Sequence, residues 1–323
     1  MKDPKALLQR FLPLLCAVVL LWASLSPYQE KNKRLRVVTG MWPVAESLMV
    51  AGDLQILPHN RFQIIEIPWA SAVARAFGSG AADVAVVTLD GALRMREAGQ
   101  KLKVIKALNQ SAGADALLAR HEIQRLQDLK GKRVGVERSA GYYLLVNALE
   151  SVGMTLAEIE AVPMFQSEME QALQGGQVAA VVVTEPWLTK LSSDGIHSLY
   201  DSSQLKVPII YLLVASERAC NSSREELKTL LKVETEMTNK IWAGKSFLGM
   251  DAVLRRENLS AAELFSCLGR LHPLNKAENA EMLKRLPQMA LQMEEQMIRT
   301  GIIHSKPADS VWIDDSFTKE ALP

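Results

Sequence analysis

A short pattern occurs twice in the sequence, as AFGSGAADVAVVT at residues 76–88 and as ALQGGQVAAVVVT at residues 172–184. The two stretches align without a gap at an offset of 96 residues, and both end in threonine, at Thr88 and Thr184. A glycine turn followed by a run of alanine and valine predicts a buried strand. We therefore expect a helix, turn and strand unit that is present in two copies.

The flanking residues extend this repeat. Arg36-Val37 and Arg133-Val134 each begin a predicted strand, 97 residues apart. Valine-rich strands converge in composition, so chance similarity is the alternative, but two widely spaced matches favour duplication. The strands that we expect are residues 34–40, 62–68, 82–88, 103–109, 132–137, 161–163 and 179–184. The helices between them are residues 43–51, 70–77, 89–98, 142–152 and 168–174.

This alternation of strands and helices predicts an α/β fold with mainly parallel sheets. Beyond residue 207 the pattern changes to one buried strand, residues 209–215, followed by a helical extension. In that extension Met282, Met289, Met293 and Met297 share one helix face, which we interpret as a core seam rather than a ligand surface. The helices expected there are residues 224–242, 261–268 and 277–300. The polar segment after residue 306 is expected to be loosely held, apart from a turn near Trp312.

Length and composition narrow the function classes. The chain has 323 residues, which is more than one hydrophobic core usually organises, so two lobes are expected. It carries 37 Lys and Arg residues against 36 Asp and Glu residues, without a basic block, so nucleic acid is not the expected main partner. Its three cysteines lack the short paired spacings of a zinc or redox site. Any pairing of Cys220 with Cys267 would therefore be incidental to the fold.

The N-terminus has the pattern of an export segment. Three basic residues precede an uncharged stretch of 19 residues, from Phe11 to Gln29. Such a stretch fits a signal peptide and is only just long enough to span a bilayer. We therefore interpret residues 1–30 as a signal peptide or a membrane anchor. Leu15 precedes Cys16 where a lipoprotein signal has a small residue, so Cys16 is interpreted as an apolar leader residue.

Candidate binding residues lie where the predicted strands end. In open parallel sheets, ligands gather beyond the carboxyl ends of the strands, where helix N-termini point their N–H groups. The loops that this rule selects hold hydroxyls, carboxylates and aromatic rings. The candidate ligand-binding residues are Met41, Trp42, Thr88, Asp90, Ser111, Asp115, Ser139, Gly141, Tyr142, Thr184, Glu185 and Trp187.

Several of these candidates have an equally simple structural interpretation. Thr88 and Thr184 are good N-caps, and the acids that follow them complement the helix dipole. Trp42 and Trp187, one in each copy, either pack in a core or form the walls of a cleft. Both interpretations stay open at the level of the sequence.

Catalytic motifs are missing. The sequence lacks G-x-S-x-G, G-x-x-x-x-G-K-[ST], G-x-G-x-x-G and H-E-x-x-H, and its five histidines are scattered. A nucleophile without a base nearby is weak support for an enzyme. We expect a protein that is not an enzyme, with neither a cofactor nor a metal site.

Several motifs together resemble a known family. They are GMWP at residues 40–43, RAFGSGAAD at 75–83, TLDGAL at 88–93, GADALLA at 113–119, LQDLKGKRVGV at 126–136 and TEP at 184–186. In these motifs the sequence resembles periplasmic solute-binding proteins of the nitrate/sulfonate/taurine/thiamine-precursor group. The likeness covers roughly residues 35–215.

The resemblance implies the type II periplasmic-binding fold, with two doubly wound α/β lobes joined by a hinge. Crossing strands are then expected near Ala114–Ala119 and Ile209–Ala215. Lobe I would comprise residues 34–113 and 207–305, lobe II residues 114–206, and a tail residues 306–323. The resemblance further implies an exported monomer that holds a small solute between its lobes and delivers it to an ABC permease in the inner membrane.

The nature of the solute stays open between two physical cues. Helix N-termini favour an anion such as a sulfonate. Asp90, Asp115 and Glu185 favour a cation or a heterocycle rich in N–H groups, because a buried carboxylate without a partner is expensive. We favour an amine-bearing or pyrimidine-like heteroaromatic solute. The alternative functions are a membrane-tethered sensing domain and an enzyme of the same fold that acts on a small metabolite.

Overall fold

A computed structural model describes residues 34–191, 195–307 and 311–322. The predicted export segment, with Cys16, lies outside the described residues. Residues 35–323 form one compact unit. Within the described ranges, no helix combines the length and the apolar character that crossing a bilayer requires.

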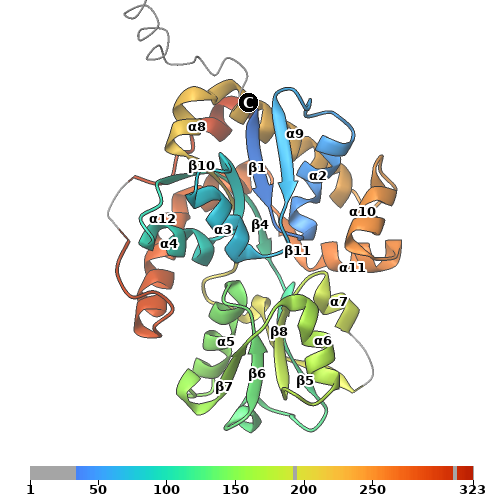
Figure 1. Cartoon of the computed structure of the whole chain (residues 1–323), viewed down its shortest axis with the longest axis vertical. Helices are drawn as coiled ribbons and strands as arrows, with labels where there is room; N and C mark the ends of the chain where they lie inside the picture. The colour runs from blue at the N-terminus through green and yellow to red at the C-terminus, as the bar shows by residue number, and fades with distance from the viewer. Residues whose placement is uncertain (1–33, 192–194, 308–310, 323) are drawn as a thin grey trace, which may run out of the picture. The chain divides into compact units, whose positions relative to one another are not determined.

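The first sheet has six strands in the order β11-β4-β10-β3-β1-β2. Its parallel strands β1, β2 and β3 come first in the chain, and β10 and β11 run antiparallel to their neighbours. Figure 1 shows this sheet in the upper part of the molecule, surrounded by helices. The strand bounds are β1 Leu35–Thr39, β2 Phe62–Glu66, β3 Val84–Thr88, β4 Leu102–Ser111, β10 Ile210–Ser216 and β11 Leu271–Pro273.

The second sheet has five strands in the order β7-β6-β8-β5-β9. Here β6 pairs in parallel with β7 and β8, whereas β5 is antiparallel to both of its neighbours. Both sheets are therefore mixed, and in each of them four strands run in the same direction, which agrees with the predicted α/β fold with mainly parallel sheets. The antiparallel strand in the middle of each sheet follows a chain crossing between sheets and not a helix. The bounds are β5 Asp115–Arg120, β6 Arg133–Val136, β7 Glu160–Pro163, β8 Ala180–Thr184 and β9 Ile196–Asp201.

The strand registers confirm the repeat. Val37 lies opposite Val84 in the first sheet, and Val134 lies opposite Ala180 in the second. These pairs are related by the offsets of 97 and 96 residues found in the sequence. The orders β4-β10-β3-β1-β2 and β9-β5-β8-β6-β7 are also equivalent. The two threonine-ended strands β3 and β8 therefore belong to separate sheets with the same design.

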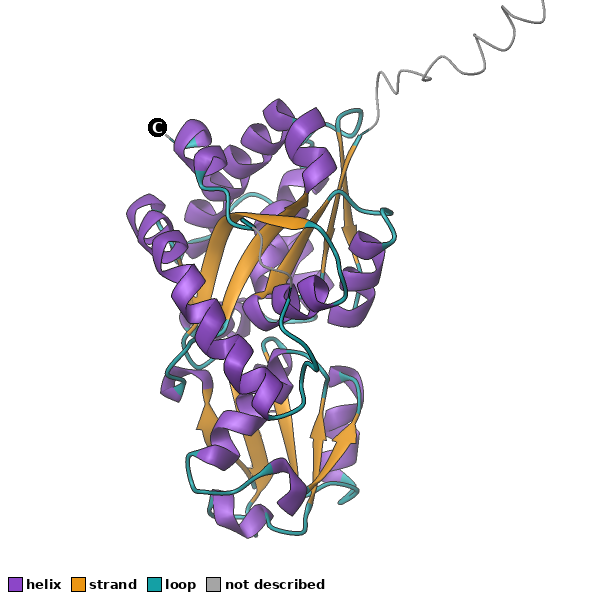
Figure 2. Cartoon of the chain, turned by 90° about the vertical axis from the view of Figure 1, so that its left-hand side faces the viewer, coloured by secondary structure: helices purple, strands orange, loops and turns teal. Residues whose placement is uncertain are grey.

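Helices flank both sheets, as Figure 2 shows from the side. Most of them lie where the sequence predicts, because glycine and proline mark their ends clearly. In the first half of the chain they are α2 Glu46–Asp53, α3 Ala70–Gly78, α4 Leu89–Glu97, α5 Ala140–Glu150, α6 Gln166–Gln174 and α7 Trp187–Leu191. In the second half they are α8 Glu217–Ser222, α9 Arg224–Trp242, α10 Met250–Glu257, α11 Ala261–Gly269, α12 Lys276–Arg299 and α13 Ser316–Ala321.

The α12 helix confirms the interpretation of the methionines. Met282, Met289, Met293 and Met297 are all buried, so they fill the core rather than line a ligand surface. The short elements β9, β11, α7, α8, α10 and α13 were not predicted, since three to eight residues are too few to show a clear hydrophobic period.

The C-terminal segment corrects one prediction. Instead of a loosely held tail, residues 311–322 pack against the first sheet. Ile313 forms a bridge to Val104 of β4, and the Arg96 guanidinium lies 4.5 Å from the centre of the Trp312 ring. The α13 helix, with Phe317 fully buried, contacts α9. Trp312 and Phe317, together with the ion pair of Arg224 and Glu320, therefore anchor this segment.

The chain passes between the two sheets at two neighbouring segments, residues 112–114 and 202–209. The Ser111 N–H donates to the Ile209 carbonyl at 2.9 Å, so the two segments are bonded to each other. Gly113 has a φ of 101°, a conformation that glycine adopts without strain. The predicted crossing strands at 114–119 and 209–215 are instead the strands β5 and β10 that follow each crossing.

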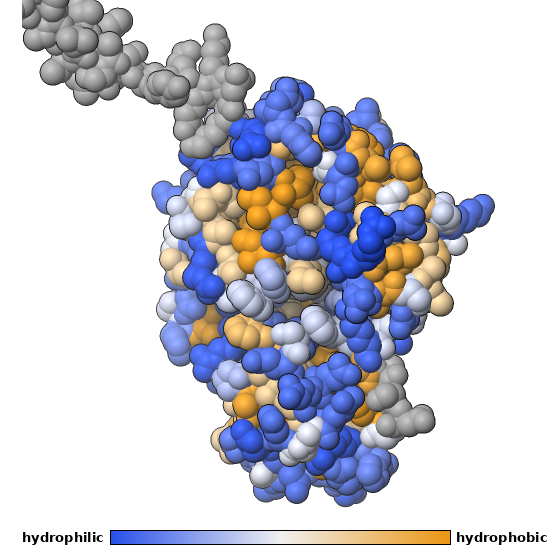
Figure 3. Space-filling view, turned by 45° about the vertical axis from the view of Figure 1, so that its right-hand side comes forward, coloured by the Kyte–Doolittle hydropathy of each residue, from blue (hydrophilic) through white to orange (hydrophobic). Residues whose placement is uncertain are grey.

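Charged residues make up 23% of the sequence, which fits a surface that is largely hydrophilic. On the face in Figure 3, hydrophilic residues cover most of the lower part, which is built on the second sheet.

Candidate functional site

A small cavity of about 20 Å³ lies at the ends of strands from both sheets. The pairing of β10 with β3 sets Tyr211 opposite Thr88, and the pairing of β5 with β8 sets Asp115 opposite Thr184. The repeat therefore brings two equivalent strand ends to the same place. The residues that line the cavity are Trp42, Ala70, Thr88, Asp115, Glu137, Ser139, Ala140, Gly141, Gln166, Val183, Thr184 and Tyr211.

One wall of the cavity is aromatic. The rings of Trp42 and Tyr211 meet edge to face, with centroids 5.7 Å apart. A side chain at Gly40 would place its Cβ atom 2.8 Å from the Trp42 ring, so glycine is required there for the indole to take this position. The Tyr211 hydroxyl lies 3.5 Å from the Thr184 hydroxyl, which belongs to the other sheet. Burial raises the pKa of Tyr211 well above its usual value, so the phenol stays neutral.

A buried carboxylate is the second part of the cavity wall. Asp115 is 2% exposed, and the Ser111 hydroxyl donates to its Oδ2 atom at 2.6 Å. Burial raises the pKa of Asp115 to about 6, and hydrogen bonds from Ser111 and Thr184 oppose this rise. The negative charges of Asp90 and Glu185 raise it further. Asp115 is therefore ionised at neutral pH, at a cost set by its burial.

A second carboxyl group, that of Glu137, follows β6 directly. Burial raises its pKa, a hydrogen bond with Gln166 lowers it, and the charge of Asp90 raises it. The Gln166 amide also accepts from the Thr184 N–H at 3.3 Å, so it links the two strand ends. The cavity thus contains two acidic groups and several hydroxyl and amide groups.

The N-terminus of α5 provides the remaining wall. Ser139 is its N-cap, and Gly141 lies so close to β8 that a Cβ atom there would be 3.2 Å from the Val182 side chain. Glycine therefore lets the helix start approach the strand end. A helix N-terminus favours negative charge, which opposes the preference of the two carboxylates.

Six of the twelve predicted residues line the cavity: Trp42, Thr88, Asp115, Ser139, Gly141 and Thr184. Ser111 lies behind Asp115 as its hydrogen-bond donor. Asp90 is buried in the first turn of α4, and its Oδ2 atom is 3.5 Å from the Arg94 guanidinium. Met41 and Tyr142 are half-buried and are not part of the cavity wall.

Glu185 and Trp187 are placed differently from the prediction. Glu185 is buried and forms an ion pair with Arg270, and its carboxylate accepts from the Thr189 hydroxyl and N–H at 3.0 Å. Its oxygens are thus used within the protein. The Trp187 ring packs under the Lys190 ammonium at 4.8 Å and also lies outside the cavity wall. Glu185 follows β8 directly, and its carboxylate also lies 3.3 Å from the Cys267 sulfur of α11, whereas Trp187 begins α7 and packs against the core beside the second sheet.

The prediction missed Ala70, Glu137, Ala140, Gln166, Val183 and Tyr211. Glu137 could have been found, because it ends the predicted strand 132–137 and is equivalent, at the repeat offset of 97, to Gly40 at the end of 34–40. Tyr211 could not, because β10 is antiparallel and only its first residues lie at the carboxyl end of β3. The direction of β10 depends on the chain crossing and not on its own sequence.

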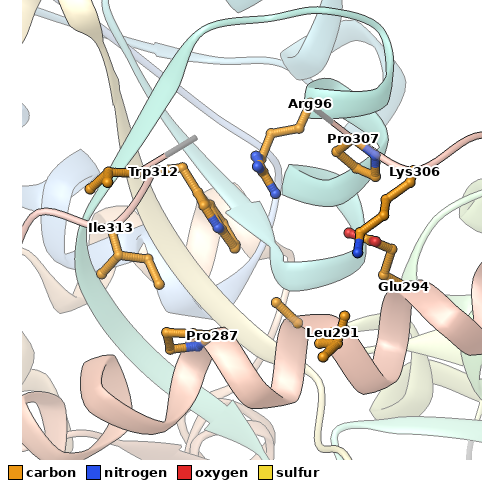
Figure 4. A pocket seen from close by; sticks show the side chains of 10 residues that line it. Arg96, Pro287, Leu291, Glu294, Lys306, Pro307, Trp312 and Ile313 are labelled. Atoms are coloured by element: carbon orange, nitrogen blue, oxygen red, sulfur yellow. The ribbon is translucent and has the colours of Figure 1, made fainter. Parts of the chain in front are cut away.

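A larger cavity of about 440 Å³ lies between α12 and the C-terminal segment. In Figure 4 the side chains of Arg96, Lys306 and Glu294 point toward it above the apolar face of α12. None of the predicted residues lines it, and its wall includes residues on both sides of the undescribed stretch 308–310. The strand-end cavity is the stronger candidate, because polar groups from two packed sheets converge there.

Comparison with known proteins supports the fold. The aliphatic sulphonate binding protein SsuA of Escherichia coli aligns with a TM-score of 0.70 at 18% identity, over 86% of this chain and 96% of that one. The desulfurization enzyme DSZB aligns with a TM-score of 0.63 at 13% identity, over 90% and 99%. This chain therefore has the periplasmic-binding-protein-like fold, which both a binding protein and an enzyme share.

Sequence comparison is more specific but covers less of the chain. A Brucella abortus protein named as a binding protein is 32% identical over 113 residues. The match spans 35% of this chain and 34% of that curated relative. The model of the family described as NMT1/THI5 like matches residues 62–240, which is more than half of the chain and includes most of the cavity wall. By this match the chain belongs to the NMT1/THI5-like family.

Proposed function

We propose that this protein is an extracytoplasmic solute-binding protein, which captures a small polar organic solute and delivers it to an ABC importer. The observation that carries the proposal is the strand-end cavity, where both copies of the repeat contribute side chains to one enclosed polar space. A site built from two sheets closes around a solute when the sheets approach each other and opens when they separate.

The size of the cavity fits a closed form. A volume of about 20 Å³ accommodates a single water molecule, whereas pockets for organic ligands are about 300 Å³ or more. Entry of a solute then requires the two sheets to move apart, and the crossings at 112–114 and 202–209 are the natural hinge. Contacts that hold the sheets together include the Lys190 ammonium on the Glu257 carbonyl at 2.6 Å and the Trp69 ring against Phe165 at 5.1 Å.

The proposed partner and location follow from this role. Residues 1–30 would direct export to the periplasm, with anchoring to the inner membrane if the segment is not cleaved. The candidate solutes are sulfonates, which the Escherichia coli structural neighbour is named for, amines and pyrimidines. The protein would act as a monomer. It would dock on a permease of the inner membrane while its two sheets enclose the solute.

The described cysteines favour binding over thiol chemistry. Burial raises the pKa of Cys220 to about 11 and that of Cys267 to about 12. A catalytic cysteine needs a lowered pKa, because the thiolate is the nucleophile. Neither thiol lines the strand-end cavity.

A thermal-shift screen of the full-length protein tests the proposal. The panel contains sulfonates, pyrimidines, amines and inorganic oxyanions, and a solute at 100 times its dissociation constant adds about 2.7 kcal/mol of stability. We expect Trp42→Ala to remove the shift and Trp187→Ala, outside the cavity, to keep it.

Two results would contradict the proposed role. One is a shift that Trp187→Ala abolishes and Trp42→Ala leaves intact, because the solute would then bind elsewhere. The other is turnover of the bound compound, measured by chromatography after prolonged incubation, which would assign an enzymatic function to the cavity.

A further inference from the structure

We infer that the solute presents a cationic or N–H-donating nitrogen group, and not an oxyanion, to the carboxylates of Asp115 and Glu137. This inference rests on the proposed function and specifies the solute class of the same cavity.

The first support is the charge of the cavity wall. Asp115 and Glu137 are acidic, and none of the described residues that line the cavity is basic. Glu137 is partly exposed and Asp115 is buried, so both carboxylates gain from a positive partner and neither finds one in the wall.

The second support is that three basic side chains on the elements around the cavity already have partners within the protein. The Arg94 guanidinium lies between Asp90 and the Ser139 carbonyl, at 3.5 Å from each. Arg270 pairs with Glu185, and the Lys190 ammonium donates to the Glu257 carbonyl at 2.6 Å. Arg138, which lies between the lining residues Glu137 and Ser139, is exposed and is not part of the cavity wall. An oxyanion entering the cavity would therefore meet two acids and no basic residue in the wall.

The third support is the direction of the hydrogen bonds behind Asp115. The Ser202 hydroxyl oxygen accepts from the Gly113 N–H at 2.9 Å and lies 2.6 Å from the Ser111 hydroxyl. Since Ser111 donates to Asp115, Ser202 must donate to Ser111. This series of hydrogen bonds fixes the Asp115 carboxylate as an acceptor on the side that faces Ser111. Its remaining lone pairs call for a donor on the solute.

The opposing influence is the N-terminus of α5, at Ser139, Ala140 and Gly141. A helix N-terminus carries about half an elementary charge, whereas each ionised carboxylate carries a whole one. The net charge that the cavity wall presents to a solute is therefore negative. The Trp42 and Tyr211 rings add to the preference, since aromatic faces attract cations and stack with planar heterocycles.

The test uses two probes with the same carbon skeleton, benzylamine and phenylmethanesulfonate, and the uncharged N–H donor 4-aminopyrimidine. Binding to the full-length protein is measured at pH 7.5 by calorimetry. Asp115→Asn and Glu137→Gln each remove one charge from the cavity, and Glu122→Gln removes one from the exposed turn after β5 as a matched control. Two cavity variants are used so that one can fail to fold without ending the test.

We expect binding of benzylamine or 4-aminopyrimidine, a loss of at least tenfold in affinity in either cavity variant, and a change below twofold in Glu122→Gln. Binding of phenylmethanesulfonate that Asp115→Asn strengthens overturns the solute class and leaves the binding role intact. Failure of all three probes and of every solute in the thermal-shift panel overturns the binding role and this inference with it.

Discussion

Replacing Asp115 with asparagine removes a charge that the folded protein keeps away from water. The side chain is 2% exposed, and burial is the largest cause that raises its pKa from 3.8 to about 6. Asparagine has nearly the same shape, and its carbonyl oxygen can still accept from the Ser111 hydroxyl. The substitution therefore isolates the charge from the packing.

The sign follows from proton binding. Between pH 3.8 and about pH 6 the folded protein holds more protons on Asp115 than the unfolded chain does, so stability falls as pH rises through this window. A rise of about two pKa units corresponds to about 3 kcal/mol of lost stability above pH 7. Asparagine carries no charge, so the variant does not lose this stability. We expect Asp115→Asn to be more stable than the wild type by about 1–3 kcal/mol at pH 7.5, and to lose this advantage toward pH 4.

Urea unfolding between pH 4.5 and pH 8, followed by circular dichroism, measures this difference. Glu122→Gln, which removes an exposed carboxylate, provides the background pH dependence. The reasoning is refuted if Asp115→Asn is less stable than the wild type at pH 7.5, or if the difference between them does not change with pH. Greater stability with weaker solute binding would mark Asp115 as a residue kept for function at the expense of the fold.

Three further predictions concern residues around the cavity. Glu185→Ala lowers the free energy of unfolding of the solute-free protein by about 2–3 kcal/mol in urea denaturation, because the Arg270 guanidinium is left partly buried without its partner. An unchanged midpoint would contradict this structural role and make Glu185 a candidate solute contact again. Gly40→Ala displaces the Trp42 ring, since the added Cβ would lie 2.8 Å from it, and lowers solute affinity at least tenfold with a shift in tryptophan emission; unchanged emission and affinity would contradict this. Cys220 and Cys267 react slowly with iodoacetamide at pH 8, as measured by peptide mass spectrometry, because both thiols have raised pKa values and stay protonated; rapid labelling of either would be inconsistent with its burial.

The duplicated α/β design could be predicted from the sequence because it depends on local patterns. Alanine and valine runs between glycine turns mark β3 and β8, and the register of the sheets preserves the offsets of the sequence. Long helices such as α9 and α12 show the same clarity, since 19 and 24 residues contain several hydrophobic periods. The C-terminal segment was misjudged because its anchoring depends on Trp312 and Phe317, two rings whose partners are distant in sequence.

The candidate site divides in the same way. Trp42, Thr88, Asp115, Ser139, Gly141 and Thr184 were predicted by one rule, that ligands gather at the carboxyl ends of parallel strands. That rule depends on strand direction, which the local sequence reveals when a helix connects two strands.

The tertiary structure decides which acidic side chains face the cavity. Asp115 and Glu185 are both acids at strand ends of the second copy, yet one lines the cavity and the other pairs with Arg270. Their difference depends on Arg270, the residue after α11 and 85 residues from Glu185 in sequence, which is a partner of Glu185 and not of Asp115. Hydrophobic periodicity is a property of neighbouring residues and can be recognised in the chain, whereas the pairing of buried charges depends on which distant segments meet, and only the folded protein determines that.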